Sequence, residues 1–197
     1  MKKFVLSLVV LITFLACSVD DVGSDLTQQA ANNQTEPECV IDVTTTPDIM
    51  GTTWERTSFV IESPIDGNND GVYSTELEDE YNCQADPLVF GTDFRTKDPT
   101  LNNVMFQVMD DGNGNLSQLI NCLIGDGLLI NYTQDGNTIN YCFNGNLLFS
   151  GTLSDDNQSL TFNFPFQGFF FPNNPILQPD GSTVDYQGGA ILTYTRQ

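Results

Sequence analysis

The chain has 197 residues, with 26 acidic residues against six basic ones, and no histidine, which gives a formal net charge of −20. So acidic a surface repels nucleic acid and anionic lipid headgroups, and we expect neither as a ligand. Without histidine the chain lacks the usual general base, the serine–histidine triads and most types of zinc site.

Residues 1–16 have the features of an export signal. Lys2 and Lys3 precede an apolar run that is too short to cross a bilayer of about 30 Å, and Cys17 follows directly. This arrangement resembles the lipobox of bacterial lipoproteins, with Phe14 where the commonest form has Leu. The resemblance implies cleavage before Cys17 and acylation of that cysteine, for example with palmitate. The alternative is an ordinary secreted protein with an incidental cysteine.

Residues 17–38 predict a flexible tether, because they are small, polar and acidic and lack aromatic side chains. Within them, residues 18–21 (Ser-Val-Asp-Asp) resemble the signal by which Bacteroidota place lipoproteins on the outer face of the outer membrane. The resemblance implies a lipid-anchored protein facing the cell surface; the alternative is an acidic linker. Loss of the signal leaves four basic residues against 26 acidic ones, a formal charge of −22.

Four cysteines remain after Cys17: Cys39, Cys83, Cys122 and Cys142. An even number in an oxidising compartment predicts disulfides, and four cysteines allow three pairings. We favour Cys39–Cys83 and Cys122–Cys142, although a flat sheet would hold the second pair too far apart unless the chain bends near Cys122. A four-cysteine metal site is the weaker alternative, because no CxxC spacing exists.

Residues 39–197 predict one all-β domain, since they are rich in Phe, Tyr, Thr, Gly and Asn. A Gly-Thr-Thr-Trp sequence ending at Trp54 opens the first expected strand, 54–61. Residues 74–83 begin with hydroxyl and acidic side chains, which predicts one short helix, and 86–91 form the next strand. This order resembles the lipocalin-like domains of Bacteroidota lipoproteins, in which the Trp plugs one barrel end.

Alternating apolar residues predict a meander of further strands. They are residues 104–109, 116–120, 128–133, 138–143, 147–153, 160–164 and 190–196. The clearest hairpin surrounds Asp135-Gly136, which suits a type I′ turn and puts Ile130, Tyr132, Ile139 and Tyr141 on one dry face. Residues 167–188 form an irregular excursion. Eight or nine antiparallel strands predict a closed up-and-down barrel.

The loop that starts at Asp66 matches the D-x-N-x-D-G pattern of a calcium loop. The candidate ligands are Asp66, Asn68, Asp70, Val72 through its carbonyl, Ser74, Glu76 and Glu78. Leu77 stands where the bidentate Glu is expected, so we expect an affinity of only about 10⁻⁴ to 10⁻³ M. The alternative is a polar turn, because turns select the same residue types.

The most apolar segment of the mature chain is rich in phenylalanine. Its first half alternates, which predicts barrel interior for Phe162, Phe164 and Phe166. Its second half does not alternate and is followed by Pro172, which ends any strand there; it consists of Phe169, Phe170 and Phe171. Core or cap packing is the simplest interpretation. The same six side chains are also the candidate contacts with a ligand or a partner.

We expect no enzymatic activity, because the sequence has no GxSxG or nucleotide-binding loop and nearly all its acids lie in turns, tether or the short helix. Two binding functions remain. In the first, a cavity in the barrel holds a small apolar ligand. In the second, aromatic side chains fill the barrel, which serves as a structural accessory subunit of an outer-membrane protein complex.

Overall fold

A computed structural model of the protein describes residues 39–81, 86–98, 104–122, 128–165 and 174–197. All of these belong to the second of two units into which the chain divides, Pro37–Gln197. The predicted signal peptide, the predicted lipid attachment at Cys17 and the predicted tether lie outside the described residues.

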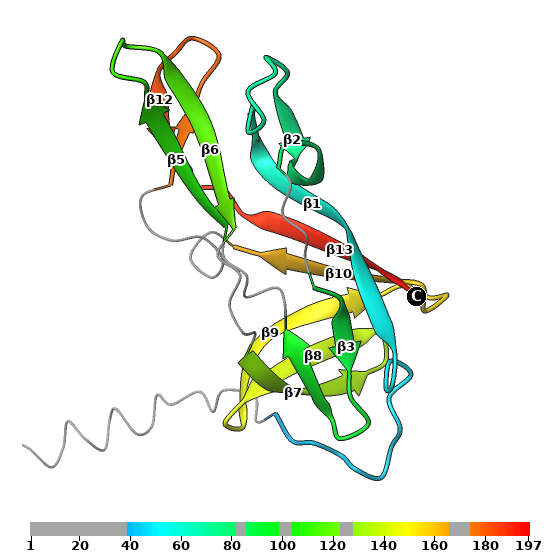
Figure 1. Ribbon diagram of the computed structural model, residues 1–197. Helices are drawn as coiled ribbons and strands as arrows, with labels where there is room; N and C mark the ends of the chain where they lie inside the picture. Colours follow the sequence, from blue (N-terminus) through cyan, green and yellow to red (C-terminus); the bar gives the residue numbers. More distant parts are fainter. Residues whose placement is uncertain (1–38, 82–85, 99–103, 123–127, 166–173) are drawn as a thin grey trace, which may run out of the picture. The chain divides into compact units, whose positions relative to one another are not determined.

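Eight strands form a closed antiparallel barrel (Figure 1). In their order around the barrel they are β1 (Thr53–Ile65), β3 (Leu88–Phe90), β4 (Arg95–Asp98), β7 (Leu128–Asp135), β8 (Thr138–Phe143), β9 (Asn146–Leu153), β10 (Ser159–Phe164) and β13 (Ala190–Arg196). Each strand pairs with the next, and β13 pairs back with β1 to close the ring. The predicted all-β fold and eight-stranded up-and-down barrel are therefore confirmed.

The strands that make up the barrel differ from those expected. The predicted strands 104–109 and 116–120 are β5 (Val104–Asp110) and β6 (Leu116–Cys122), which pair only with each other, as a separate hairpin between β4 and β7. Their place in the ring is taken by β4, which has four mostly polar residues. A strand this short carries almost no periodic signal: only Thr96 is known to be buried in it.

The β7–β8 hairpin follows the predicted faces. Ile130, Tyr132, Ile139 and Tyr141 are all fully buried, and Tyr132 lies opposite Tyr141. The predicted turn is wrong by one residue, because Asp135 already pairs with Thr138. Gly136, at φ +54°, is thus the first of the two central residues. A glycine there, followed by a residue of negative φ, is typical of a type II′ turn.

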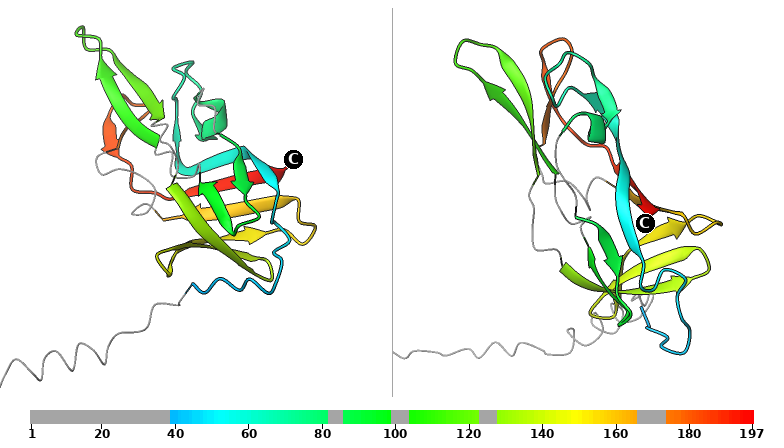
Figure 2. Two further views of the ribbon diagram at one scale, coloured as in Figure 1. Left: turned by 60° about the horizontal axis from the view of Figure 1, so that its bottom comes forward. Right: turned by 45° about the vertical axis from the view of Figure 1, so that its right-hand side comes forward.

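A second hairpin lies between β10 and β13, inside the predicted irregular excursion. It consists of β11 (Pro175–Leu177) and β12 (Thr183–Asp185). Hairpin β5–β6, hairpin β11–β12 and the far half of β1 lie at the same end of the barrel (Figures 1 and 2). There β2 (Ser74–Glu76) pairs with β1 at Val60 and Ile65.

The expected short helix at 74–83 is largely wrong. Its first residues form β2, and a single 3₁₀ turn, η2 (Leu77–Asp79), follows. The cause is the side chain of Glu76, which caps η2 while bonding to β1. Among the described residues, no helix has the length and apolar character needed to cross a bilayer.

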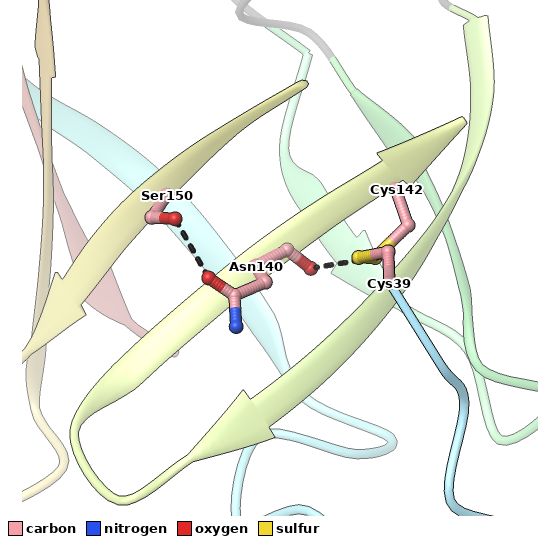
Figure 3. The surroundings of a disulfide bond; sticks show 4 residues. All are labelled: Cys39, Asn140, Cys142 and Ser150. Atoms are coloured by element: carbon pink, nitrogen blue, oxygen red, sulfur yellow. Dashed lines mark hydrogen bonds between the residues drawn. A yellow bond between two sulfur atoms is a disulfide. The ribbon is translucent and has the colours of Figure 1, made fainter. Parts of the chain in front are cut away.

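One disulfide joins Cys39 to Cys142 of β8, with their Cα atoms 5.7 Å apart (Figure 3). The favoured pairs Cys39–Cys83 and Cys122–Cys142 are therefore wrong, because each sulfur forms a single disulfide. The arm before the barrel runs beside the β8–β9 turn, where Cys39 donates its N–H to Gly145 at 2.9 Å. Cys83 and the side chain of Cys122 lie outside the described part of the chain.

The disulfide lies beside a polar contact between β8 and β9 (Figure 3). Ser150 donates a hydrogen bond of 2.6 Å to the side-chain oxygen of Asn140, whose carbonyl oxygen is 3.8 Å from the sulfur of Cys142. The disulfide joins two cysteines that are 103 residues apart in the sequence. By restricting the unfolded chain, a loop of this length stabilises a domain by about 4–5 kcal/mol in the chain-entropy model.

Candidate functional site

The inner face of the barrel is filled with aromatic rings that contact one another. Tyr141 stacks on Phe90 and on Phe162, with ring centroids 6.1 and 5.3 Å apart. Phe149 meets Tyr141 and Phe164 edge to face at 4.7 and 5.1 Å. The fully or almost fully buried aromatic side chains of the barrel strands are Trp54, Phe59, Phe90, Tyr132, Tyr141, Phe162, Phe164 and Tyr194.

The ring of Phe162 packs directly against the backbone of the neighbouring strand. A Cβ on Gly151 of the neighbouring β9 would collide with that ring, with Cδ1 only 2.8 Å away. Phe162 and Phe164, two of the six candidate ligand or partner contacts, are therefore interior residues, as their alternation predicts. The other four candidates stay predictions, because they lie outside the described residues: Phe166, Phe169, Phe170 and Phe171.

A buried arginine links β1 to η2. Thr57 forms a β-bulge opposite β13, which reverses the alternation of β1. Trp54 and Arg56 therefore point inward before the bulge, and Phe59 does so after it. The side chain of Arg56 is only 5% exposed and bonds to Glu78 at 2.5 Å and to the hydroxyl of Tyr81 at 2.6 Å.

The surroundings of Arg56 are aromatic as well as acidic. Its guanidinium lies 5.3 Å from the ring centroid of Phe59 and 5.9 Å from that of Tyr81. Burial raises the pKa of the Tyr81 hydroxyl above its ordinary value, and the charge of Arg56 opposes that shift. The cluster is a satisfied ion pair, whose geometry holds η2 against β1.

The predicted calcium loop is a turn closed by its own side chains. Asp66 accepts hydrogen bonds from the backbone N–H groups of Asp70 and Gly71 at 3.0 and 2.9 Å. Asn68 accepts a second bond from the N–H of Asp70, and Asp70 accepts one from Val72. The structure thus brings the side chains of Asp66, Asn68 and Asp70 together, in hydrogen bonds typical of Asx turns.

The other candidate ligands lie elsewhere. Glu76 accepts hydrogen bonds from β1, and Glu78 is paired with Arg56. The hydroxyl of Ser74 accepts a bond from the N–H of Glu76, and Val72 is exposed. Within the described ranges, no three acidic or cysteine side chains lie close enough to hold a metal ion together. Calcium binding stays a prediction, and in this conformation it depends on Asp66, Asn68 and Asp70.

A cleft of about 540 Å³ separates the β1–β2 hairpin and η2 from β6. One side carries three consecutive acids, Glu78, Asp79 and Glu80, and the lining also includes Tyr81, Leu119 and Ile120. Gly67 allows this close approach, because a Cβ there would lie 2.7 Å from the carbonyl oxygen of Glu80 and would collide with Ile120.

The hairpins around the cleft, β1–β2, β5–β6 and β11–β12, are not joined to one another by strand pairing. Hydrogen bonds from side-chain amides connect them. Asn69 both donates to and accepts from the backbone of Gln118, at 2.9 and 3.0 Å. The side chain of Gln118, which is 3% exposed, accepts a bond from the N–H of Leu177 at 2.7 Å. Likewise the buried Asn174 accepts one from the N–H of Phe106 in β5 at 3.1 Å.

A smaller hollow of about 290 Å³ lies beside the N-terminal arm, and its lining includes Val40, Pro47 and Phe94.

Phe94 has φ +61°, a conformation that strains a bulky side chain by about 1–3 kcal/mol. Tyr132 holds it there by donating its N–H to the carbonyl of Phe94 at 3.0 Å. Asp and Gly at neighbouring positions signal a turn, but no sequence signal marks Phe94 as the strained residue.

The residues that shape the cleft were missed by sequence reasoning for different reasons. Arg56 stands out as one of only six basic residues in the chain, a signal that could have been used. Glu80 is one acid among 26, and only the fold shows that it is buried.

Comparisons with protein-family models, with curated proteins and with solved structures find no match for this chain.

Proposed function

We propose that the mature chain is a non-catalytic outer-membrane lipoprotein whose filled barrel presents its outer surface to a protein partner, as an accessory subunit of an outer-membrane complex. The single observation that carries this proposal is the aromatic packing inside the barrel. Ligand sites in proteins are cavities of roughly 300–1,000 Å³. The rings of Phe90, Tyr141 and Phe162 contact one another where a barrel ligand would lie.

The proposed location rests on the sequence. The lipobox resemblance supports a lipid anchor at Cys17, and residues 18–21 support the outer face of the outer membrane. The tether of residues 17–38 would hold the acidic barrel away from anionic headgroups. The formal charge of the mature chain favours a partner with a basic surface, because unlike charges accelerate and orient association.

The alternative function, capture of a small apolar ligand in the barrel, would require the stacked rings to separate. Opening a ligand cavity at Phe162 would forfeit contacts with Phe149, Phe164 and Tyr194. Such losses destabilise a core by several kcal/mol. The packing therefore supports the filled-barrel function over the ligand-binding one.

The test is a native pull-down of the full chain from detergent-solubilised membranes through a C-terminal tag, with mass spectrometry of both proteins and lipids. We expect one enriched protein in stoichiometric amount and no stoichiometric apolar small molecule. The control is Cys17→Ser, which should lose acylation, membrane attachment and the partner. Recovery of a stoichiometric lipid-like molecule, or of neither a protein nor a lipid, would overturn the proposal.

A further inference from the structure

We propose that the cleft between η2 and β6 binds a lysine or arginine side chain of a protein partner, with Glu80 as its anion. This inference deepens the proposed function and rests on it.

Glu80 carries a largely buried carboxylate with one hydrogen bond and no ion pair among the described residues. The residue is only 3% exposed, yet it lines the cleft. One carboxylate oxygen accepts a hydrogen bond from the N–H of Gly67 at 2.9 Å. Within the described ranges, no other group donates to this carboxylate and no cation pairs with it. A buried charge is expensive unless it is paired and hydrogen-bonded, so the site calls for a cationic donor.

The chain itself does not supply that cation. Arg56, the basic residue of the adjoining cluster, is bonded to Glu78 and to Tyr81. In the described part of the chain, the only other ion pair joins Arg95 to Asp93 on a turn. A second copy of this acidic chain is a poor source of the cation, since the two copies repel each other. A partner with a basic side chain is complementary.

The walls of the cleft favour an organic cation over a metal ion. Leu119, which is 39% exposed, and Ile120 of β6 offer apolar contact beside the acids. Lysine and arginine place an apolar stem along such surfaces while their charged head reaches an anion. A divalent cation would need several carboxylates around one point, and the described residues hold no such group.

The test measures binding of a labelled peptide to the full chain in detergent micelles by fluorescence polarisation. The probe is acetyl-Leu-Lys-Leu-amide, and its matched control has norleucine in place of lysine. We expect the lysine peptide to bind at least about tenfold more tightly than the norleucine peptide, because only the ammonium pairs with the buried carboxylate. We also expect its binding to weaken severalfold in 0.5 M NaCl.

Three variants assign the binding to the cleft. Glu80→Gln keeps an acceptor for the N–H of Gly67 but removes the charge, and should weaken lysine-peptide binding about tenfold. Leu119→Ser, at an exposed position, should weaken it about threefold by removing apolar contact. Glu55→Gln removes the same charge from an exposed position on β1 and should leave binding unchanged. Thermal unfolding of each variant checks that it is folded.

Equal binding by Glu80→Gln and the wild type, or by the two peptides, would overturn the inference. Displacement of the peptide by about 5 mM CaCl₂, but not by NaCl of equal ionic strength, would also overturn it and assign the cleft to a divalent cation. The pull-down reads out separately: a partner captured equally well by Glu80→Gln would sustain the proposed function and reject the cleft as its site.

Discussion

Replacing Gln118 with leucine should weaken the attachment of hairpin β5–β6 to hairpin β11–β12 and destabilise the fold. The substitution keeps the side-chain volume similar but removes both the amide oxygen that accepts from Leu177 at 2.7 Å and the nitrogen that donates to Gln107 at 3.0 Å. Leaving a buried polar group without a partner costs about 1–3 kcal/mol. Two such groups predict a loss of about 2–6 kcal/mol in the free energy of unfolding.

The assay is urea unfolding followed by circular dichroism, together with hydrogen exchange of the backbone amides. For a domain of this size, the expected loss lowers Tm by about 4–24 °C. The N–H of Leu177 should exchange faster in Gln118→Leu, while the N–H of Tyr132 in the barrel stays protected. Gln158→Leu, in the exposed β9–β10 turn, should change stability by less than about 0.5 kcal/mol. An unchanged stability with a protected Leu177 amide would refute this account of the hairpins.

Three further outcomes follow from particular side chains. Phe162→Ala should lower the free energy of unfolding by about 3–5 kcal/mol in urea titrations. Phe143→Ala, at a 39% exposed position, should lower it by less than about 1 kcal/mol. Equal losses in the two variants would contradict a packed interior. The hydrogen bonds from Asn115 and the neighbouring backbone lower the pKa of Asp111 from 3.8 to about 2. The Asp111 carboxylate therefore stabilises the fold fully above about pH 4 and loses this contribution as the pH falls through about 2. Between pH 4 and pH 2 the Tm of Asp111→Asn should decline less steeply than the Tm of the wild type. Equal declines of the two Tm values would contradict a stabilising role for this carboxylate. Calcium bound at the expected affinity should raise the free energy of unfolding by about 1–2 kcal/mol in 5 mM CaCl₂ relative to EDTA. Asp66→Ala should remove that shift, and the absence of a shift in the wild type would remove calcium from consideration.

Local alternation was enough to predict most of the barrel. In β8, in β10 and over Ile130–Tyr132 of β7, apolar and polar residues alternate, so Ile130, Tyr141 and Phe162 could be placed on the inner face before any pairing was known. The closed ring followed from the number of strands. Which strands belong to the ring did not, because alternation is the same in a barrel strand and in an independent hairpin such as β5–β6.

The features that shape the cleft depend on contacts between distant residues. The bulge at Thr57 turns Arg56 inward, but a bulge depends on the register with β13 and leaves no local signal. Glu80 is buried beside Gly67, 13 residues away along the chain, which donates its N–H to the carboxylate. The disulfide pairing likewise depends on where the N-terminal arm crosses the β8–β9 turn, which spacing along the chain does not reveal.

The filled barrel can be tested most directly with Trp54, the single tryptophan of the chain, which is fully buried in β1. A fluorescent fatty-acid probe is titrated into the protein, and energy transfer from Trp54 to the probe is followed. A barrel filled by its own rings predicts no saturable transfer and no displacement by unlabelled fatty acid. Saturable transfer at one probe per protein, reversed by unlabelled fatty acid, would contradict the filled barrel and restore the ligand-binding function.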